Sequence, residues 1–188
     1  ITTGEGGMVL TDDDDLAEQC RELRNLCFKP GKRFVHERLG WNLRMTNLQA
    51  AVGVAQLERL DEFLEKKRWI GQRYNELLAD LPGVQLPQPQ TDYAENIYWV
   101  YGLVLDKSLG DAETMMGKLA KAGIGTRPFF YPMNLQPVLK NKRLLGEEGF
   151  PVAGRLHCLG FYVPSGLALE KRHIKRTAEA IRQEIKSC

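Results

Sequence analysis

The sequence predicts an α/β protein, and three observations support this. Apolar residues recur at helical spacing from Leu48 to Leu81, where Pro82 and Gly83 end the pattern. A continuous aromatic and β-branched stretch follows, and an amphipathic helical pattern closes the chain. Strands that alternate with helices are typical of an α/β domain, so we expect a small sheet in the second half.

The residues before the long helical pattern are expected to hold a short strand, a helix and a loop. Met8–Thr11 is a short apolar run, and the aspartates after it favour a helix from about Leu16 to Leu26. We interpret Asp12–Asp15 as a solvated helix cap rather than a metal site, because adjacent side chains at a helix start do not converge on one ion. Proline and glycine then predict a loop over Phe28–Asn42.

The central helical pattern begins with a recognisable signal. Thr46 and Gln49 have the spacing of a capping box, in which each side chain bonds the backbone of the other residue. The pattern predicts one continuous helix of roughly 50 Å, at about 1.5 Å per residue. A helix of this length often connects two domains.

The second half is expected to alternate strands with helices. Ile97–Leu105 predicts a strand, Asp111 caps a helix through about Ala122, and Gly123–Arg127 forms a turn into a second strand. Further helices are expected over residues 135–146, 152–159 and 169–185.

Composition excludes several classes of function. The 188 residues carry 26 basic and 24 acidic side chains, a net charge of +2, which gives no electrostatic case for binding nucleic acid. No apolar run approaches the roughly 20 residues of a membrane span. The four cysteines form no CxxC pair and the three histidines show no ligand spacing, so we expect no metal centre.

Three segments carry a resemblance to a known family. The first is the glycine-rich run ITTGEGGM at Ile1, the second is LGWNLRMTNLQAA from Leu39, and the third is GIGTRP from Gly123, extending through Gln136 and Pro137. In this order they resemble the DegT/DnrJ/EryC1/StrS family of sugar aminotransferases, which use pyridoxal phosphate (PLP).

The resemblance implies a type I fold, similar to that of aspartate aminotransferase. Residues 1–47 would end the large PLP-binding domain, and residues 48–188 would form the linking helix and the small C-terminal domain. The lysine that binds PLP is expected just upstream of Ile1, so no catalytic residue is expected in this chain. The resemblance also implies a cytoplasmic homodimer with shared active sites.

The resemblance assigns five site residues. Asn42 would reach the PLP phosphate of the other subunit, whereas the residues alone favour a turn asparagine. Arg44 would contact substrate, or form a surface salt bridge. Phe129 and Tyr131 would line the substrate site, or pack in a core turn. Asn134 stands where many members have histidine and cannot act as an acid or base near neutral pH, so a proton-transfer role is not expected there.

The implied reaction is the transfer of an amino group, from glutamate, to a nucleotide-linked 4-keto-6-deoxy sugar. GDP is the expected nucleotide, and the product would enter surface-polysaccharide or deoxysugar biosynthesis. Two alternatives stay open. Some members carry histidine in place of the lysine and dehydrate deoxysugars, and a non-catalytic dimerisation or binding module belongs to a different class.

Overall fold

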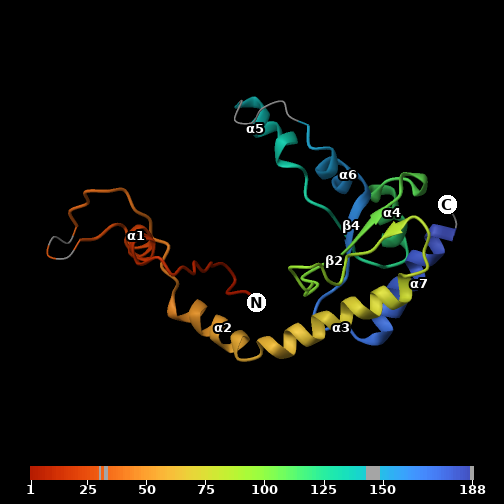
Figure 1. Cartoon of the computed structure of the whole chain (residues 1–188), viewed down its shortest axis with the longest axis horizontal. Coiled ribbons are helices and arrows are strands. Elements are labelled where there is room, and N and C mark those ends of the chain that lie inside the picture. The colour runs from red at the N-terminus through yellow and green to blue at the C-terminus, as the bar shows by residue number, and fades with distance from the viewer. Residues whose placement is uncertain (30, 32–33, 143–148, 187–188) are drawn as a thin grey trace. The chain divides into compact units, whose positions relative to one another are not determined.

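The computed structural model describes residues 1–29, 31, 34–142 and 149–186. The chain divides into two compact units, Ile1–Leu60 and Asp61–Cys188, which we call the N-terminal and C-terminal units (Figure 1). The expected domain division after residue 47 stays a prediction. No helix in the described ranges has the length and apolar character of a membrane span.

The N-terminal unit contains helices α1 (Asp14–Arg24) and α2 (Asn47–Leu57). Asp13 caps α1 by accepting a hydrogen bond from Leu16 N at 2.9 Å, and both bonds of the capping box at Thr46 are present. These two caps are confirmed. Residues 8–11 form no strand, so that prediction is wrong, because an apolar run becomes a strand only beside a partner for its backbone.

The predicted single long helix is two helices, so that expectation is also wrong. α2 ends at Leu57 and α3 spans Leu60–Leu78. Arg59 N donates to Gln56 O at 3.1 Å, a three-residue step that replaces the four-residue step of an α-helix.

Helix α2 has an unusual surface. Its sequence NLQAAVGVAQL holds no charged residue, yet none of its side chains is buried. Leu48 is 83% exposed and Val52 is 50% exposed. Among the described residues, Cys27 is the only buried apolar side chain of the N-terminal unit. This unit therefore has almost no core of its own.

The C-terminal unit is built on a four-stranded sheet in the order β1-β2-β4-β3. The strands are β1 (Val84–Gln85), β2 (Tyr101–Leu105), β3 (Arg127–Pro128) and β4 (Gly160–Val163). Each neighbouring pair is antiparallel, so β2 and β3 lie parallel on the two sides of β4. Helix α4 (Ala112–Lys121) connects β2 to β3, which confirms the predicted strand–helix–strand unit. In the sheet, β4 lies between these two strands, although it comes later in the sequence.

The remaining elements are η1 (Lys107–Leu109), η2 (Met133–Leu135), α5 (Pro137–Asn141), α6 (Pro151–Leu159) and α7 (Lys171–Lys186). The cap at Asp111 is confirmed by a 2.7 Å bond from Thr114 N. Of the helix predicted over residues 135–146, α5 covers Pro137–Asn141, and residues 143–146 of the prediction lie outside the described ranges. The strand predicted from Ile97 begins only at Tyr101, because Tyr98 has a φ of 51°, which no extended strand accommodates.

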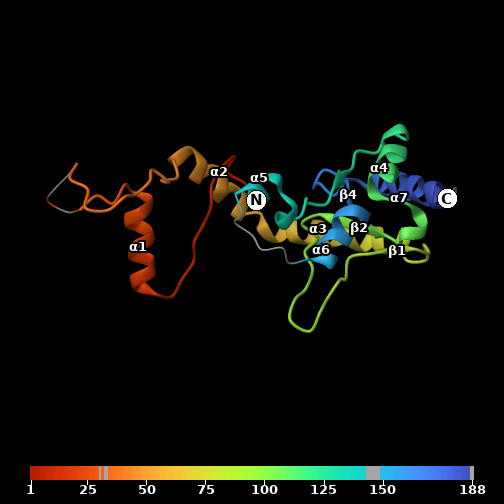
Figure 2. The same cartoon turned by 90° about the horizontal axis from the view of Figure 1, so that it is seen from above.

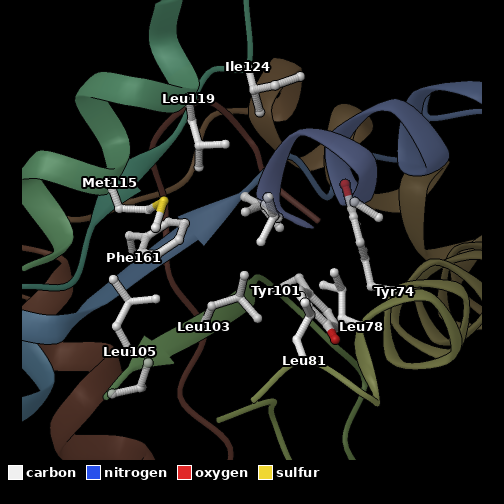
Figure 3. Close-up of a cluster of buried hydrophobic side chains, with 14 of the residues drawn as sticks. Tyr74, Leu78, Leu81, Tyr101, Leu103, Leu105, Met115, Leu119, Ile124 and Phe161 are labelled. Atoms are coloured by element: carbon white, nitrogen blue, oxygen red, sulfur yellow. The ribbon is translucent and has the colours of Figure 1, made fainter. Parts of the chain in front are cut away.

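The core lies between one face of the sheet and the helices, as Figure 3 shows. Leu103 and Phe161 point from β2 and β4 toward Met115 and Leu119 of α4. α3 and α7 lie side by side (Figure 1), and Arg182 Nε of α7 donates to Leu77 O at 2.8 Å.

Three tyrosines join α3 to β2. Tyr74 stacks on Tyr101 with ring centroids 4.7 Å apart, and Asn75 bridges the hydroxyls of Tyr98 and Tyr101 at 3.1 and 2.6 Å. Burial raises the pKa of Tyr74 to about 12. The Tyr98 ring lies directly against Gly71 of α3. These contacts hold one end of the connection between β1 and β2, which loops away from the sheet in Figure 2.

Candidate functional site

Asn42 is held by the backbone that follows α1. Trp41 N donates to Leu23 O at 2.8 Å, and Leu43 N donates to Arg24 O at 2.9 Å. Between these bonds, Asn42 pairs with Asn25 in an antiparallel bridge. The position of Asn42 is therefore fixed by main-chain bonds on both sides.

Gly40 makes this arrangement possible. A Cβ at this position would lie 2.6 Å from the backbone nitrogen of Cys27, closer than any real contact. Leu26 and Cys27 both adopt positive φ angles, of 60° and 50°, to turn the chain at the end of α1. A glycine is needed where two backbones approach this closely.

Arg44 fixes the orientation of the Asn42 amide. Its Nε donates to Asn42 Oδ1 at 2.9 Å. A guanidinium has donors and no acceptor, so the bonded amide atom must be the oxygen. The Nδ2 group of Asn42 is therefore the part of the amide offered to a ligand, and it is a donor.

A shallow, open depression lies beside this pair. Its volume is about 480 Å³, and it is lined by Asn25, Phe28, Lys29, Gly31 and Arg44. Lys29 Nζ bonds Glu22 at 2.5 Å, and this bond holds the pKa of the Glu22 carboxyl below its usual value. A neutral donor on Asn42 and the guanidinium of Arg44 are groups that suit a phosphate, so these residues fit the phosphate of the cofactor that the resemblance implies.

The glycine-rich run at Ile1 lies on α2. Gln56 exchanges two hydrogen bonds with the backbone of Thr2, at 3.0 and 2.5 Å, and Gln49 Nε2 donates to Glu5 O at 3.0 Å. Two of the three segments that carry the family resemblance are thus joined by glutamine side chains. This contact was not predicted from the sequence.

The aromatic segment belongs to the C-terminal unit. Phe129 stacks on Tyr162 of β4 at 4.6 Å between ring centroids, and Phe130 meets the same ring edge-on. Tyr131 meets the ring of His157, in α6, at 4.8 Å and 74°. Phe130 is 74% exposed and Tyr131 is 46% exposed. The segment therefore presents two aromatic rings to solvent.

The structure brings the predicted site residues together in two groups. Asn42 and Arg44 are bonded within the N-terminal unit, while Phe129 and Tyr131 lie two residues apart in the C-terminal unit, followed by Asn134 in η2. The roles given to all five stay predictions. Sequence reasoning did not find Tyr162 or His157, because their proximity to the aromatic segment depends on how β3 and α6 meet β4.

Comparisons with known proteins agree with the resemblance. Residues 1–182 match the DegT/DnrJ/EryC1/StrS aminotransferase family. The chain is 35% identical to GDP-perosamine synthase from Vibrio cholerae, over 97% of this chain and 49% of that protein. It is 36% identical to GDP-perosamine synthase from Caulobacter vibrioides, over the same shares of the two chains. The chain thus spans about half the length of the curated relatives it matches.

The same relationship holds in three dimensions. The crystal structure of the aminotransferase TlmJ from Streptoalloteichus hindustanus superposes with a TM-score of 0.87, at 26% identity, over 98% of this chain and 49% of that one. The expected type I fold is confirmed, and pyridoxal phosphate is the cofactor of such proteins. The chain belongs to the DegT/DnrJ/EryC1/StrS aminotransferase family.

Proposed function

We propose that this chain is part of a PLP-dependent aminotransferase that transfers an amino group from glutamate to a nucleotide-linked 4-keto-6-deoxy sugar. Family membership over residues 1–182 carries the proposal, and similarity to two GDP-perosamine synthases points to a GDP-linked sugar. Surface-polysaccharide or deoxysugar biosynthesis would use such a product.

The N-terminal unit would contribute to the cofactor site. When bound, PLP supplies the electron sink for amino transfer. Asn42 would donate from Nδ2 to the phosphate, across the interface to the other subunit. Arg44 would keep the amide in that orientation through its 2.9 Å bond to Oδ1, and its remaining guanidinium donors would face substrate oxygens. The lysine that holds the cofactor would come from the other half of the enzyme.

The aromatic segment would contribute to the sugar site. Exposed rings at Phe130 and Tyr131 offer flat apolar surfaces, which suit the C–H faces of a deoxysugar or a nucleobase. Asn134 lies three residues beyond Tyr131 and would give the sugar or its phosphate a neutral hydrogen bond.

A substrate comparison tests this proposal. The complete enzyme, loaded with PLP and supplied with glutamate, is expected to release 2-oxoglutarate with a GDP-linked 4-keto-6-deoxy sugar. UDP- and dTDP-linked keto-sugars are the matched alternatives. Turnover confined to UDP or dTDP sugars would contradict the GDP assignment and leave the class intact. Water elimination without amino transfer would indicate a dehydratase, and brisk turnover of ordinary keto acids alone would contradict the sugar assignment.

A homodimer with shared sites is part of the proposal. The exposed apolar side chains of α2, such as Leu48 and Val52, support it, because apolar surface of this kind is normally covered by protein. Sedimentation of the complete enzyme is expected to give a dimer or a higher even oligomer. A fully active monomer would contradict a site that is built from two subunits.

A further inference from the structure

Two glycines create a slot on the face of the sheet opposite to the one that carries Tyr101, Leu103 and Phe161. Tyr101, Leu103 and Phe161 are fully buried in the core. Because side chains alternate along a strand, Gly102 of β2 and Gly160 of β4 face the other side. Their cross-strand partners, Tyr162 and Val104, carry side chains on this face, and the missing Cβ atoms of the two glycines leave a gap beside them.

The ring of Phe129 fills this slot. A Cβ at Gly102 would lie 2.7 Å from Phe129 Cζ, and a Cβ at Gly160 would lie 2.6 Å from Phe129 Cδ2. Both distances are shorter than real contacts, so the ring occupies the space that the two side chains would take. Phe129 N also donates to Gly160 O at 3.1 Å, and Tyr162 stacks on the ring at 4.6 Å. Phe129 is therefore held by its backbone, by the slot and by a stacked neighbour.

We propose that Phe129 is a positioning residue: its ring, seated over Gly102 and Gly160, sets where Phe130 and Tyr131 stand for the sugar substrate. This inference rests on the proposed function. It differs from the role that the resemblance implies for Phe129, which is direct contact with substrate. The ring is half-buried and packs against the core cluster, whereas its two neighbours are exposed.

The geometry explains how the effect is transmitted. Phe130 and Tyr131 follow Phe129 directly, so a fixed first residue limits where the next two can lie. Tyr162 and His157 then complete the placement through edge-on ring contacts with Phe130 and Tyr131. A displacement of about 1 Å at such a segment is enough to weaken substrate positioning severely.

The test separates the sugar step from the amino-donor step. In the complete PLP-loaded enzyme, Phe129→Ala is expected to raise KM for the nucleotide sugar by about tenfold, while the amino-donor half-reaction with glutamate changes less than twofold. Gly102→Ala should do the same, because the new methyl group displaces the ring. The double variant Gly102→Ala/Phe129→Leu is expected to be less impaired than Gly102→Ala alone, since the smaller leucine leaves room for the methyl.

Gly125→Ala is the matched control, because a Cβ there meets nothing within 4 Å. It is expected to leave both half-reactions unchanged. Gly160→Ala is a poorer probe, since its Cβ would also meet the backbone oxygen of Leu156. An unchanged sugar KM in Phe129→Ala, or an equal loss in both half-reactions, would overturn the positioning role alone. Failure of the unsubstituted enzyme to turn over any nucleotide sugar would overturn the proposed function, and this inference with it.

Discussion

Asn42→Ala is expected to weaken retention of pyridoxal phosphate by about tenfold to a hundredfold without unfolding the protein. A lost hydrogen bond to a charged group costs on the order of 1.5–3 kcal/mol, which corresponds to this range of affinity. The fold should survive, because main-chain bonds of the neighbouring residues Trp41 and Leu43 hold this segment. Cofactor titration of the complete enzyme, followed by visible absorbance, measures the effect, and the unfolding midpoint checks the fold.

Asn42→Asp distinguishes a phosphate donor from a residue that only shapes the turn. Aspartate keeps an oxygen for Arg44 Nε, so the bond observed at 2.9 Å can persist. It replaces the Nδ2 donor with a negative oxygen, which repels phosphate. We therefore expect Asn42→Asp to bind cofactor at least as poorly as Asn42→Ala. Normal affinity in the aspartate variant would assign Asn42 to the turn.

Gly71→Ala is expected to lower the free energy of unfolding by about 2 kcal/mol, within the range for overpacked cores. A Cβ at this position would overlap the Tyr98 ring, including Cδ1 at 2.5 Å. Tyr98 cannot yield easily, because it is 3% exposed and its hydroxyl accepts a bond from Asn75 at 3.1 Å. Urea unfolding followed by intrinsic fluorescence measures the change.

Gly117→Ala is the matched control for Gly71→Ala. Gly117 also lies within a helix, α4, but a Cβ there meets nothing within 4 Å. Alanine is favoured over glycine in a helix by about 1 kcal/mol, so this variant should be slightly more stable than the parent. If both variants gained stability equally, the close contact between Tyr98 and α3 would not contribute to the free energy of unfolding.

Signals that act over three or four residues could be predicted from the sequence. The caps at Asp13, Thr46 and Asp111 depend on a side chain that bonds a nearby backbone nitrogen, and all three are present. The break between α2 and α3, after Leu57, contains no glycine or proline, so the residues that usually end a helix did not reveal it.

The sequence proposed candidate site residues, whose roles stay predictions, but it did not predict their geometry. Family motifs drew attention to Asn42 and Arg44, yet no sequence pattern predicts that Arg44 Nε fixes the orientation of the Asn42 amide. Phe129 was selected as an aromatic residue of the substrate loop. Its seat depends on the register of β2 with β4, which pairs Gly102 with Tyr162 across two distant stretches of chain.

The strand order also determines when the sheet of this unit can form while the chain is being synthesised. A ribosome adds about 5–20 residues per second, and β4 emerges about 30 residues after β3. Until then neither β2 nor β3 has its central partner, because β4 lies between them. In a nascent chain paused before Gly160, the ring of Phe129 therefore lacks Gly160 and Tyr162, two of the residues that hold it in the fold. We expect this apolar ring to be covered only when β4 is inserted between β2 and β3.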